Sequence, residues 1–171
     1  GDLVSVALRE GKYQPKVAGA VVQARRDAVH SGRRGQIRQH MKDGRIIATI
    51  EPMHGNNAVL YTPGEGKSWK RRVVDDTLAD GHAVACADLL GKGADQIVAG
   101  WRGKNAEGKV GIKMFVPGDE SGADWDVVWI DDNEMACEDL KVADLNDDGH
   151  PDIVAAGRAT KNVKIYWNTG K

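Results

Sequence analysis

The chain has 171 residues, a formal net charge of −1, 21 glycines and two cysteines. This length allows one domain with a buried core, and the near-neutral charge argues against general binding to nucleic acid or to a membrane surface. No run of 18 apolar residues could span a bilayer, and no signal peptide is recognisable, so we expect any export signal to lie outside this sequence. Cys86 and Cys137 lack a metal-binding spacing and have small or apolar neighbours, so we expect two buried free thiols, with a disulfide as the alternative.

Residues 1–44 differ from the rest of the chain. They contain nine Lys or Arg and four Asp or Glu, an excess of five positive charges (9 − 4 = 5). Residues 3–8 are predicted to form a strand, and residues 17–28 suit either a strand or a helix. A basic segment can bind anions or nucleic acid, but this one has no aromatic residue beyond Tyr13 to stack on bases. We interpret it as a solvated arm, with an anion-binding patch as the alternative.

Residues 45–171 contain three copies of one unit. Residues 69–76 resemble residues 125–132 at a shift of 56 positions (125 − 69 = 56). Two further pairs of segments match at this shift: Ala87-Asp88-Leu89 with Ala143-Asp144-Leu145, and Ile97-Val98-Ala99 with Ile153-Val154-Ala155. Residues 112–115 match residues 163–166 at a shift of 51, because the loop before the strand is longer in the middle copy. An earlier copy aligns Ile46-Ile47-Ala48 with Ile97-Val98-Ala99, and residues 60–64 with residues 114–118.

Each copy is predicted to contain a strand, an acidic loop, a second strand, a turn, a third strand and a final strand that begins with tryptophan. Trp69 and Trp125 occupy the same place in successive copies, so we expect both indoles to be buried against neighbouring sheets. Four short strands in a repeat of about 50 residues are typical of a β-propeller blade. The sequence therefore predicts an all-β fold with about three four-stranded propeller blades.

The acidic loop of the last copy has the pattern of a calcium site. Oxygen-bearing side chains fall at its first, third, fifth and ninth positions, which are Asp144, Asn146, Asp148 and Asp152. A tight turn directs alternate side chains inward, and Ca²⁺ takes six to eight oxygen ligands. Gly149 provides the backbone freedom for the turn, and His150 would contribute its backbone carbonyl. The sequence predicts one bound Ca²⁺, and the alternative is a polar surface turn without an ion.

The same loop in the middle copy has lost most of these ligands. Asp88 keeps its carboxylate, but Leu90, Lys92 and Gln96 replace the next three ligand positions. We hypothesise that the Lys92 ammonium takes the place of the ion and binds Asp88. The alternative is that Lys92 points into solvent, as most lysines do. In the first copy the loop is absent around residues 42–44.

Two segments, residues 143–157 and 87–100, resemble the FG-GAP/VCBS family of calcium-loop β-propellers. Residues 51–55, 80–83 and 135–140 are similar to the propeller domains of aldos-2-ulose dehydratases. The resemblance implies propeller blades over residues 45–171, a bound Ca²⁺ and an extracytoplasmic location. Because propellers close with four to eight blades, we expect further blades or self-assembly to complete the ring, and residues 1–44 could supply a truncated blade.

Polar residues recur where the loops of each copy meet its strands. The shift of 56 places His82 on Glu138 and Ala83 on Asp139, at the start of the first strand. The second strand of each copy is followed in turn by His54, Arg102 and Arg158. In a propeller these positions share the channel face, where carboxylates accept hydrogen bonds from hydroxyls and arginine binds a carboxylate or carbonyl. For each residue the alternative is a satisfied polar group at a loop end.

Three classes of function follow. We expect first a calcium-stabilised module that binds a carbohydrate or a protein partner at the channel face. The dehydratase resemblance implies a second class, an enzyme that catalyses β-elimination from a keto-sugar. His82 or Glu138 would be the base, with Asp139 and His54 beside them. Arg102 and Arg158 would bind the substrate. The third is a structural repeat segment of a larger exported protein. The sequence shows no nucleophile elbow, phosphate-binding glycine loop or HExxH motif, which argues against hydrolases and nucleotide binding.

Overall fold

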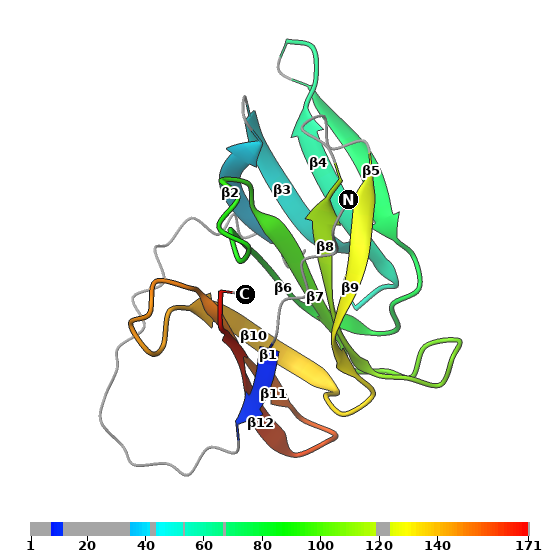
Figure 1. Cartoon of the computed structure of the whole chain (residues 1–171). Coiled ribbons are helices and arrows are strands. Elements are labelled where there is room, and N and C mark those ends of the chain that lie inside the picture. Colours follow the sequence, from blue (N-terminus) through cyan, green and yellow to red (C-terminus); the bar gives the residue numbers. More distant parts are fainter. Residues whose placement is uncertain are drawn as a thin grey trace.

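A computed structural model of the chain describes residues 8–11, 35–41, 44–52, 54–66, 68–118 and 124–170. These residues form strands and no helix, so the expected all-β class is confirmed. The strands make three four-stranded antiparallel sheets (Figure 1). The described part of the chain contains no helix long and apolar enough to cross a membrane. Residues 17–28, and most of residues 3–8, lie outside the described residues.

Within each sheet, neighbouring strands follow one another in the sequence, with one exception. The first sheet comprises β2 (Gly35–Met41), β3 (Gly44–Glu51), β4 (Asn57–Pro63) and β5 (Trp69–Asp75). The second sheet comprises β6 (Gly81–Ala87), β7 (Gln96–Trp101), β8 (Gly111–Pro117) and β9 (Trp125–Asp132). The third comprises β10 (Cys137–Ala143), β11 (Asp152–Gly157), β12 (Asn162–Asn168) and, next to β12, the N-terminal strand β1 (Leu8–Gly11). The basic segment 1–44 therefore contributes β1 and β2 to two different sheets.

The strand register agrees with the repeat at most positions. Trp69 pairs with Pro63 at the start of β5, as Trp125 pairs with Pro117 at the start of β9. The alignment of β3 is wrong by one residue, because Ala48 pairs with Leu60 whereas Val98 pairs with Met114. The counterpart of Val98 is thus Ala48 and not Ile47. A run of small and apolar residues reads almost the same after a slip of one position, although the slip moves every side chain to the other face.

The second sheet lies between the other two, and two of its four strands are buried on both faces. Every residue of β6 and β7 is buried, which explains why these strands are continuously apolar instead of alternating. One apolar core, including Leu60, Ile97 and Phe115, lies between the first and second sheets. The other, including Met114, Leu140 and Ile153, lies between the second and third. The innermost strand β6 packs against both β3 and β10.

Both junctions between sheets contain the same buried ion pair. Lys113 Nζ on β8 lies 2.8 Å from Asp75 Oδ2 at the end of β5. Lys164 Nζ on β12 lies 2.9 Å from Asp131 Oδ2 at the end of β9. Asp75 and Asp131 correspond at the shift of 56, and the two lysines correspond at the shift of 51. The second and third sheets are therefore each joined to the preceding sheet by a lysine on their third strand.

The two tryptophans differ in burial. Trp125 is partly buried and packs against the core between the first and second sheets. Trp69 is 43% exposed, so the expectation that both indoles are buried is wrong for Trp69. The physical reason is position: Trp125 faces the preceding sheet, whereas the described residues contain no sheet that precedes the first one.

The two cysteines, Cys86 and Cys137, are free and buried, as expected. Burial, followed by the nearby carboxylates, raises the pKa of Cys137 to about 12. This thiol is therefore protonated at physiological pH and is not a nucleophile.

Candidate functional site

Strands β6 and β10 begin with the same irregularity. Gly81 pairs with Trp101 and Ala83 with Gly100, so His82 is the extra residue of a β-bulge. In the third sheet the register jumps in the same way from Cys137 to Asp139, which makes Glu138 the extra residue. A bulge re-aims the side chain of its extra residue, and bulges are common beside functional sites. The side chains of His82 and Glu138, which the repeat alignment places at equivalent positions, are therefore both redirected by a β-bulge.

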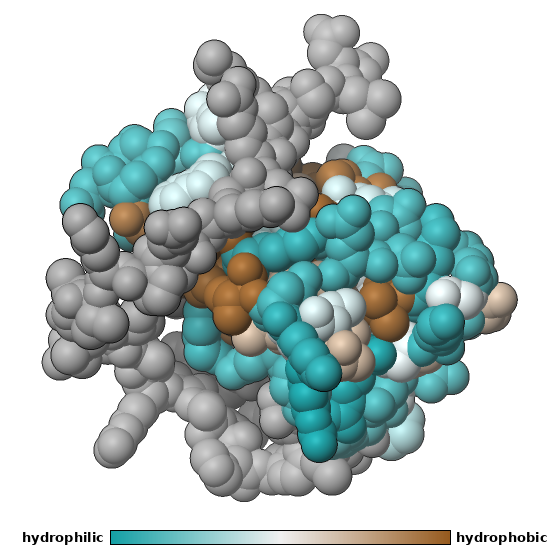
Figure 2. Space-filling model, turned by 90° about the horizontal axis from the view of Figure 1, so that it is seen from below, coloured by the Kyte–Doolittle hydropathy of each residue, from teal (hydrophilic) through white to brown (hydrophobic). Residues whose placement is uncertain are grey.

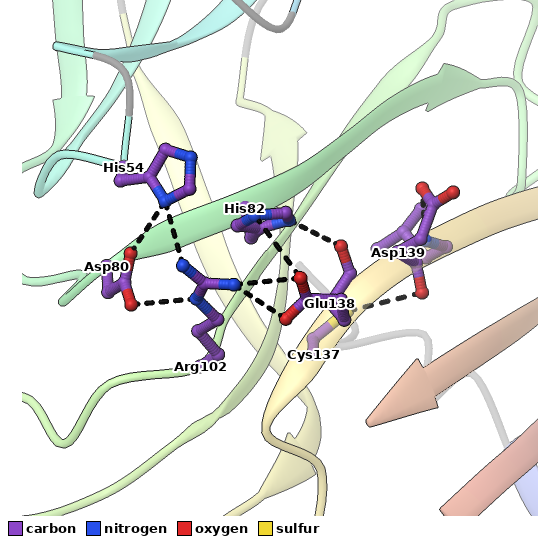
Figure 3. Close-up of polar contacts among 8 residues, drawn as sticks. His54, Asp80, His82, Arg102, Cys137, Glu138 and Asp139 are labelled. Atoms are coloured by element: carbon purple, nitrogen blue, oxygen red, sulfur yellow. Dashed lines mark hydrogen bonds and ion pairs between the residues drawn. The ribbon is translucent and has the colours of Figure 1, made fainter. Parts of the chain in front are cut away.

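Arg102, directly after β7, is the centre of a polar cluster that joins the three sheets (Figure 3). Its Nε donates to Asp80 Oδ2 at 2.7 Å, and its Nη1 donates to both carboxylate oxygens of Glu138 at 2.8 Å. Its Nη2 lies 2.9 Å from His54 Nδ1, on the loop between β3 and β4. His54 Nδ1 is also 3.1 Å from Asp80 Oδ1. We call His54, Asp80, His82, Arg102 and Glu138 the junction cluster.

His82 is the most buried member of the junction cluster, with 4% of its surface exposed. Its Nδ1 lies 2.6 Å from the backbone carbonyl oxygen of Glu138. Because a carbonyl can only accept, Nδ1 carries the hydrogen. Nε2 lies 3.5 Å from Glu138 Oε1, and the ring meets that of His54 edge to face at 4.6 Å between centroids.

The charges of the junction cluster are set by Arg102. Its hydrogen bonds to Glu138 and Asp80 lower the pKa of each carboxyl group, against the smaller opposing effect of burial. The same hydrogen bonds raise the pKa of Arg102, and the bond with Asp80 has the larger effect. At neutral pH the cluster thus holds two carboxylates and one guanidinium. A cation has no place between the carboxylates, because the arginine fills it.

Close backbone approaches bring the three sheets together here. A Cβ atom at Gly100 on β7 would collide with the side chain of Cys137 on β10. A Cβ at Gly81 would lie 2.7 Å from Ile50 Cγ2 on β3. Glycine at both positions therefore lets β6 and β7 approach their neighbours closely enough for Arg102 to reach Glu138.

The structure brings together most of the predicted site residues. His54, His82, Arg102 and Glu138 meet, but Asp139 does not join them, because the bulge turns it outward. Its carboxylate accepts from the backbone N of Leu140 at 2.9 Å and from Lys141 Nζ at 3.4 Å. Figure 3 shows Asp139 on the far side of Glu138 from Arg102.

Arg158 lies beside the cluster and lines, with Glu138, a shallow cavity of about 390 Å³ over the β11–β12 turn. Its charge adds to the lowering of the pKa of Glu138, after the larger effect of Arg102.

Sequence reasoning missed Asp80. An Asp-Gly pair before a strand reads as a turn, and the pairing with Arg102 spans 22 positions. The backbone offers a signal once the structure is known, since Asp80 and His54 both adopt a positive φ, 52° and 59°. Such angles are uncommon outside glycine, and they cluster at functional sites.

The loop 144–152 folds around its first carboxylate. Asp144 accepts from the backbone N of Asp148 at 3.2 Å and of Gly149 at 2.8 Å. Asp152 accepts from the backbone N of Leu145 and of Asn168. Oxygen-bearing side chains of this kind suit calcium, but here the carboxylate oxygens of Asp144 and Asp152 accept hydrogen bonds from backbone N–H groups. The described residues contain no cluster of three or more His, Cys, Asp or Glu side chains arranged to hold a metal.

The loop of the middle copy has the same backbone contacts. Asp88 accepts from the backbone N of Lys92 at 2.9 Å and of Gly93 at 2.7 Å, as Asp144 does 56 positions later. The Lys92 side chain is exposed and lies within 4 Å of no carboxylate among the described residues. The hypothesis that its ammonium replaces an ion is therefore wrong. The Asp88 carboxylate is instead bound by backbone N–H groups.

Comparison with known proteins identifies no relative: no family model, curated protein or solved structure matches the chain.

Proposed function

We propose that the chain is a β-propeller module that binds a carbohydrate at the junction cluster. The observation that carries this proposal is the position of Arg102, which ties together groups from all three sheets on one face of the molecule. A site assembled from several repeats, each supplying a different side chain, suits an asymmetric ligand with many polar groups.

The arrangement of the sheets supports the propeller. Three four-stranded antiparallel sheets follow one another along the chain, with β6 packed against strands of both neighbouring sheets. The lysine–aspartate pair recurs at both junctions, as expected for repeats related by rotation. Membership of the FG-GAP/VCBS family is part of the proposal and rests on residues 143–157 and 87–100. Further blades or self-assembly would complete the ring.

The chemistry of the junction cluster favours hydroxyl groups as its ligands. Arg102 holds Asp80 and Glu138 charged and fixed in place, and each carboxylate retains lone pairs that can accept hydrogen bonds from sugar hydroxyls. Acceptors that are already oriented lose little freedom when a ligand binds. Five side chains make a small site, whereas a stable protein interface buries about 800 Å² on each partner. A carbohydrate therefore fits better than a protein partner.

Calcium binding at the loop 144–152 is a separate part of the proposal. Asp144, Asn146, Asp148 and Asp152, with the carbonyl of His150, would be the ligands. The backbone contacts of Asp144 support it, because they preform the turn that the ion would need. The matching contacts of Asp88 show that this turn is compatible with an ion-free loop.

A lyase is the second candidate, favoured by the orientation of His82. With its hydrogen on Nδ1, directed at the Glu138 carbonyl, Nε2 is the basic nitrogen. In this scheme Nε2 takes the proton next to the carbonyl of a keto-sugar, and the resulting imidazolium returns that proton to the hydroxyl on the β-carbon, which leaves as water. Arg102 would stabilise the enolate with its positive charge. Glu138 is the poorer base, because Arg102 lowers its pKa.

Binding is tested by calorimetric titration with four neutral tetrasaccharides, those of β-1,4-glucose, α-1,4-glucose, β-1,4-xylose and β-1,4-mannose. We expect at least one to bind, and Glu138→Gln to weaken it about tenfold, since hydrogen bonds to charged groups contribute about 1.5–3 kcal/mol. Asp139→Asn is the matched control, a neighbouring carboxylate that is turned away, and should bind like the unaltered protein. Equal losses in the two variants would contradict the proposed site.

The lyase is tested with a 2-keto and a 3-keto sugar. Ultraviolet absorbance of an unsaturated ketone that is lost in His82→Gln would support it. Binding without absorbance leaves the binding module, and neither signal leaves a structural repeat segment.

A further inference from the structure

Arg158 is the counterpart of Arg102 in the third sheet, since 158 − 56 = 102. Arg102 is bound by carboxylates on both sides. Arg158 is exposed and makes no hydrogen bond or ion pair with any described residue. Arg102 lies between the sheet that carries it and the third sheet, where Glu138 binds it.

A second cation lies on the same turn. Lys161 lines the shallow cavity beside Arg158, and within the described ranges no carboxylate lies within 4 Å of its ammonium. Glu138 also lines this cavity, so the cavity adjoins the junction cluster. Val163, which is 54% exposed, adds an apolar surface on which a sugar ring can pack.

The charges of this combined surface do not cancel. Arg102, Arg158 and Lys161 contribute three positive charges, and Asp80 and Glu138 contribute two negative ones, which leaves +1 when the two histidines are left out of the count (3 − 2 = 1). The excess lies over the β11–β12 turn, because Arg102 already neutralises the carboxylates nearest to it. A ligand with a single negative charge on that side would balance it.

We propose that the carbohydrate is an acidic one, whose carboxylate is bound by Arg158 and Lys161 while its hydroxyls reach Glu138. This inference rests on the proposed function and adds the class of sugar. The planar guanidinium of Arg158 matches a carboxylate with two parallel hydrogen bonds, and Lys161 contributes a second donor and charge. A neutral sugar would leave both cations without a partner.

The test uses two ligands that differ only at C6. One is the β-1,4-linked glucose tetramer, and the other is the same tetramer with the C6 hydroxymethyl group of its non-reducing end replaced by a carboxylate. We expect the full chain to bind the acidic tetramer about tenfold more tightly at low salt. This preference should shrink in 1 M NaCl, where the Debye length falls to about 3 Å.

Arg158→Gln and Lys161→Gln should each reduce the ratio of the two dissociation constants toward one. Lys70→Gln removes an exposed lysine of β5 in the first sheet and should keep the ratio. Equal affinity for both tetramers would overturn the acidic assignment and leave carbohydrate binding intact, as would a preference that survives in both variants. Failure of both tetramers and of the four neutral tetrasaccharides would overturn the proposed function itself.

Discussion

At the scale of single residues, Arg102 holds the junction cluster together. Its three nitrogen atoms contact groups that enter the cluster from three sheets. A lysine at this position would offer one ammonium in place of a planar fork, and could not bind Asp80 and Glu138 at once in the same geometry. The residue therefore fixes both the charge of the site and the distance between its carboxylates.

The first prediction concerns pH. The pKa values of Glu138 and Asp80 are lowered in the folded protein by Arg102. Their contribution to stability is therefore present above their ordinary pKa values near 4, and is lost as the pH falls through the lowered values. We expect Arg102→Gln to lower Tm at pH 7, and the difference from the unaltered protein to narrow as the pH falls below about 4, the ordinary pKa of these groups.

Lys104→Gln is the control for this measurement, because Lys104 is exposed on the same loop. It should show no such pH dependence. A Tm difference for Arg102→Gln that is the same at pH 7 and pH 3 would show that the two carboxylates do not depend on Arg102.

The second prediction concerns the glycine at the junction. A Cβ at Gly100 collides with both the Cβ and the sulfur of Cys137, so rotation of the thiol cannot relieve the contact. We expect Gly100→Ala to destabilise the fold by about 1–3 kcal/mol, measured by urea unfolding. Gly118→Ala, where the added carbon meets only ordinary contacts of 3.4 Å or more, should change stability little. Equal stability of the two variants would contradict the close approach of β7 and β10.

Sequence reasoning reached the site unevenly. His82 and Glu138 were predicted because the repeat places them in register, and the structure shows that each is the extra residue of a bulge. Asp139 was wrongly grouped with these residues because a single sequence does not reveal a bulge. Without knowledge of the bulge at Glu138, the direction of the Asp139 side chain cannot be predicted. Asp80 was missed because its partner lies on another strand.

At the scale of elements, the lysine–aspartate pairs recur at equivalent positions of successive sheets, as the strands do. In each case a lysine of the third strand crosses to the end of the fourth strand of the preceding sheet. Lys113 also donates to Thr77 at 2.8 Å, and Lys164 to Glu134 at 2.7 Å. These added contacts satisfy the ammonium groups where water is excluded, as a buried charge requires.

The third prediction tests these pairs. Lys113→Met and Lys164→Met each leave a buried aspartate without its cation, so we expect each to cost about 3–5 kcal/mol of unfolding free energy. Pairing Lys113→Met with Asp75→Leu should recover much of the loss, because both charges are then removed. Lys109→Met breaks an exposed pair with Asp132 and should cost less than about 1 kcal/mol. A loss for Lys113→Met as small as that of Lys109→Met would contradict the buried pair.

The fourth prediction concerns calcium. If the loop 144–152 binds the ion, millimolar Ca²⁺ should raise Tm by mass action. Asp148→Ala should abolish this rise, and Lys92→Ala, in the corresponding loop of the second sheet, should preserve it. Identical melting curves in Ca²⁺ and in chelator would overturn the calcium proposal while leaving the carbohydrate site untouched.

At this scale the sequence predicts where the strands lie better than it predicts which face of each strand packs against the neighbouring sheet. The period of the repeat located strands β6 to β12 of the second and third sheets, because glycine and acidic turns separate the apolar runs, but it did not place β1 beside β12. The slip at β3 arose because Ile46, Ile47 and Ala48 are all apolar, so only the pairing with β4 determines which side faces the second sheet.

At the scale of the whole molecule, the three sheets are not equivalent in environment. Strands β6 and β7 of the second are buried throughout, whereas the corresponding strands β10 and β11 of the third include residues that are partly or fully exposed. Seen from below, the described residues are mostly hydrophilic, with hydrophobic residues in small separate patches (Figure 2). The repeat predicts similar sheets, but burial depends on what lies next to each sheet, which a repeat alone does not determine.

The fifth prediction follows the ligand to its site. The central claim is that a carbohydrate binds where the three sheets meet, and the histidine imidazole resonances test it most directly. On titration with a tetrasaccharide that binds, we expect the ring signals of His54 and His82 to shift in proportion to occupancy, while those of His150, in the loop 144–152, stay in place. Saturable binding that moves only His150, or that leaves both His54 and His82 unchanged, would contradict the claim.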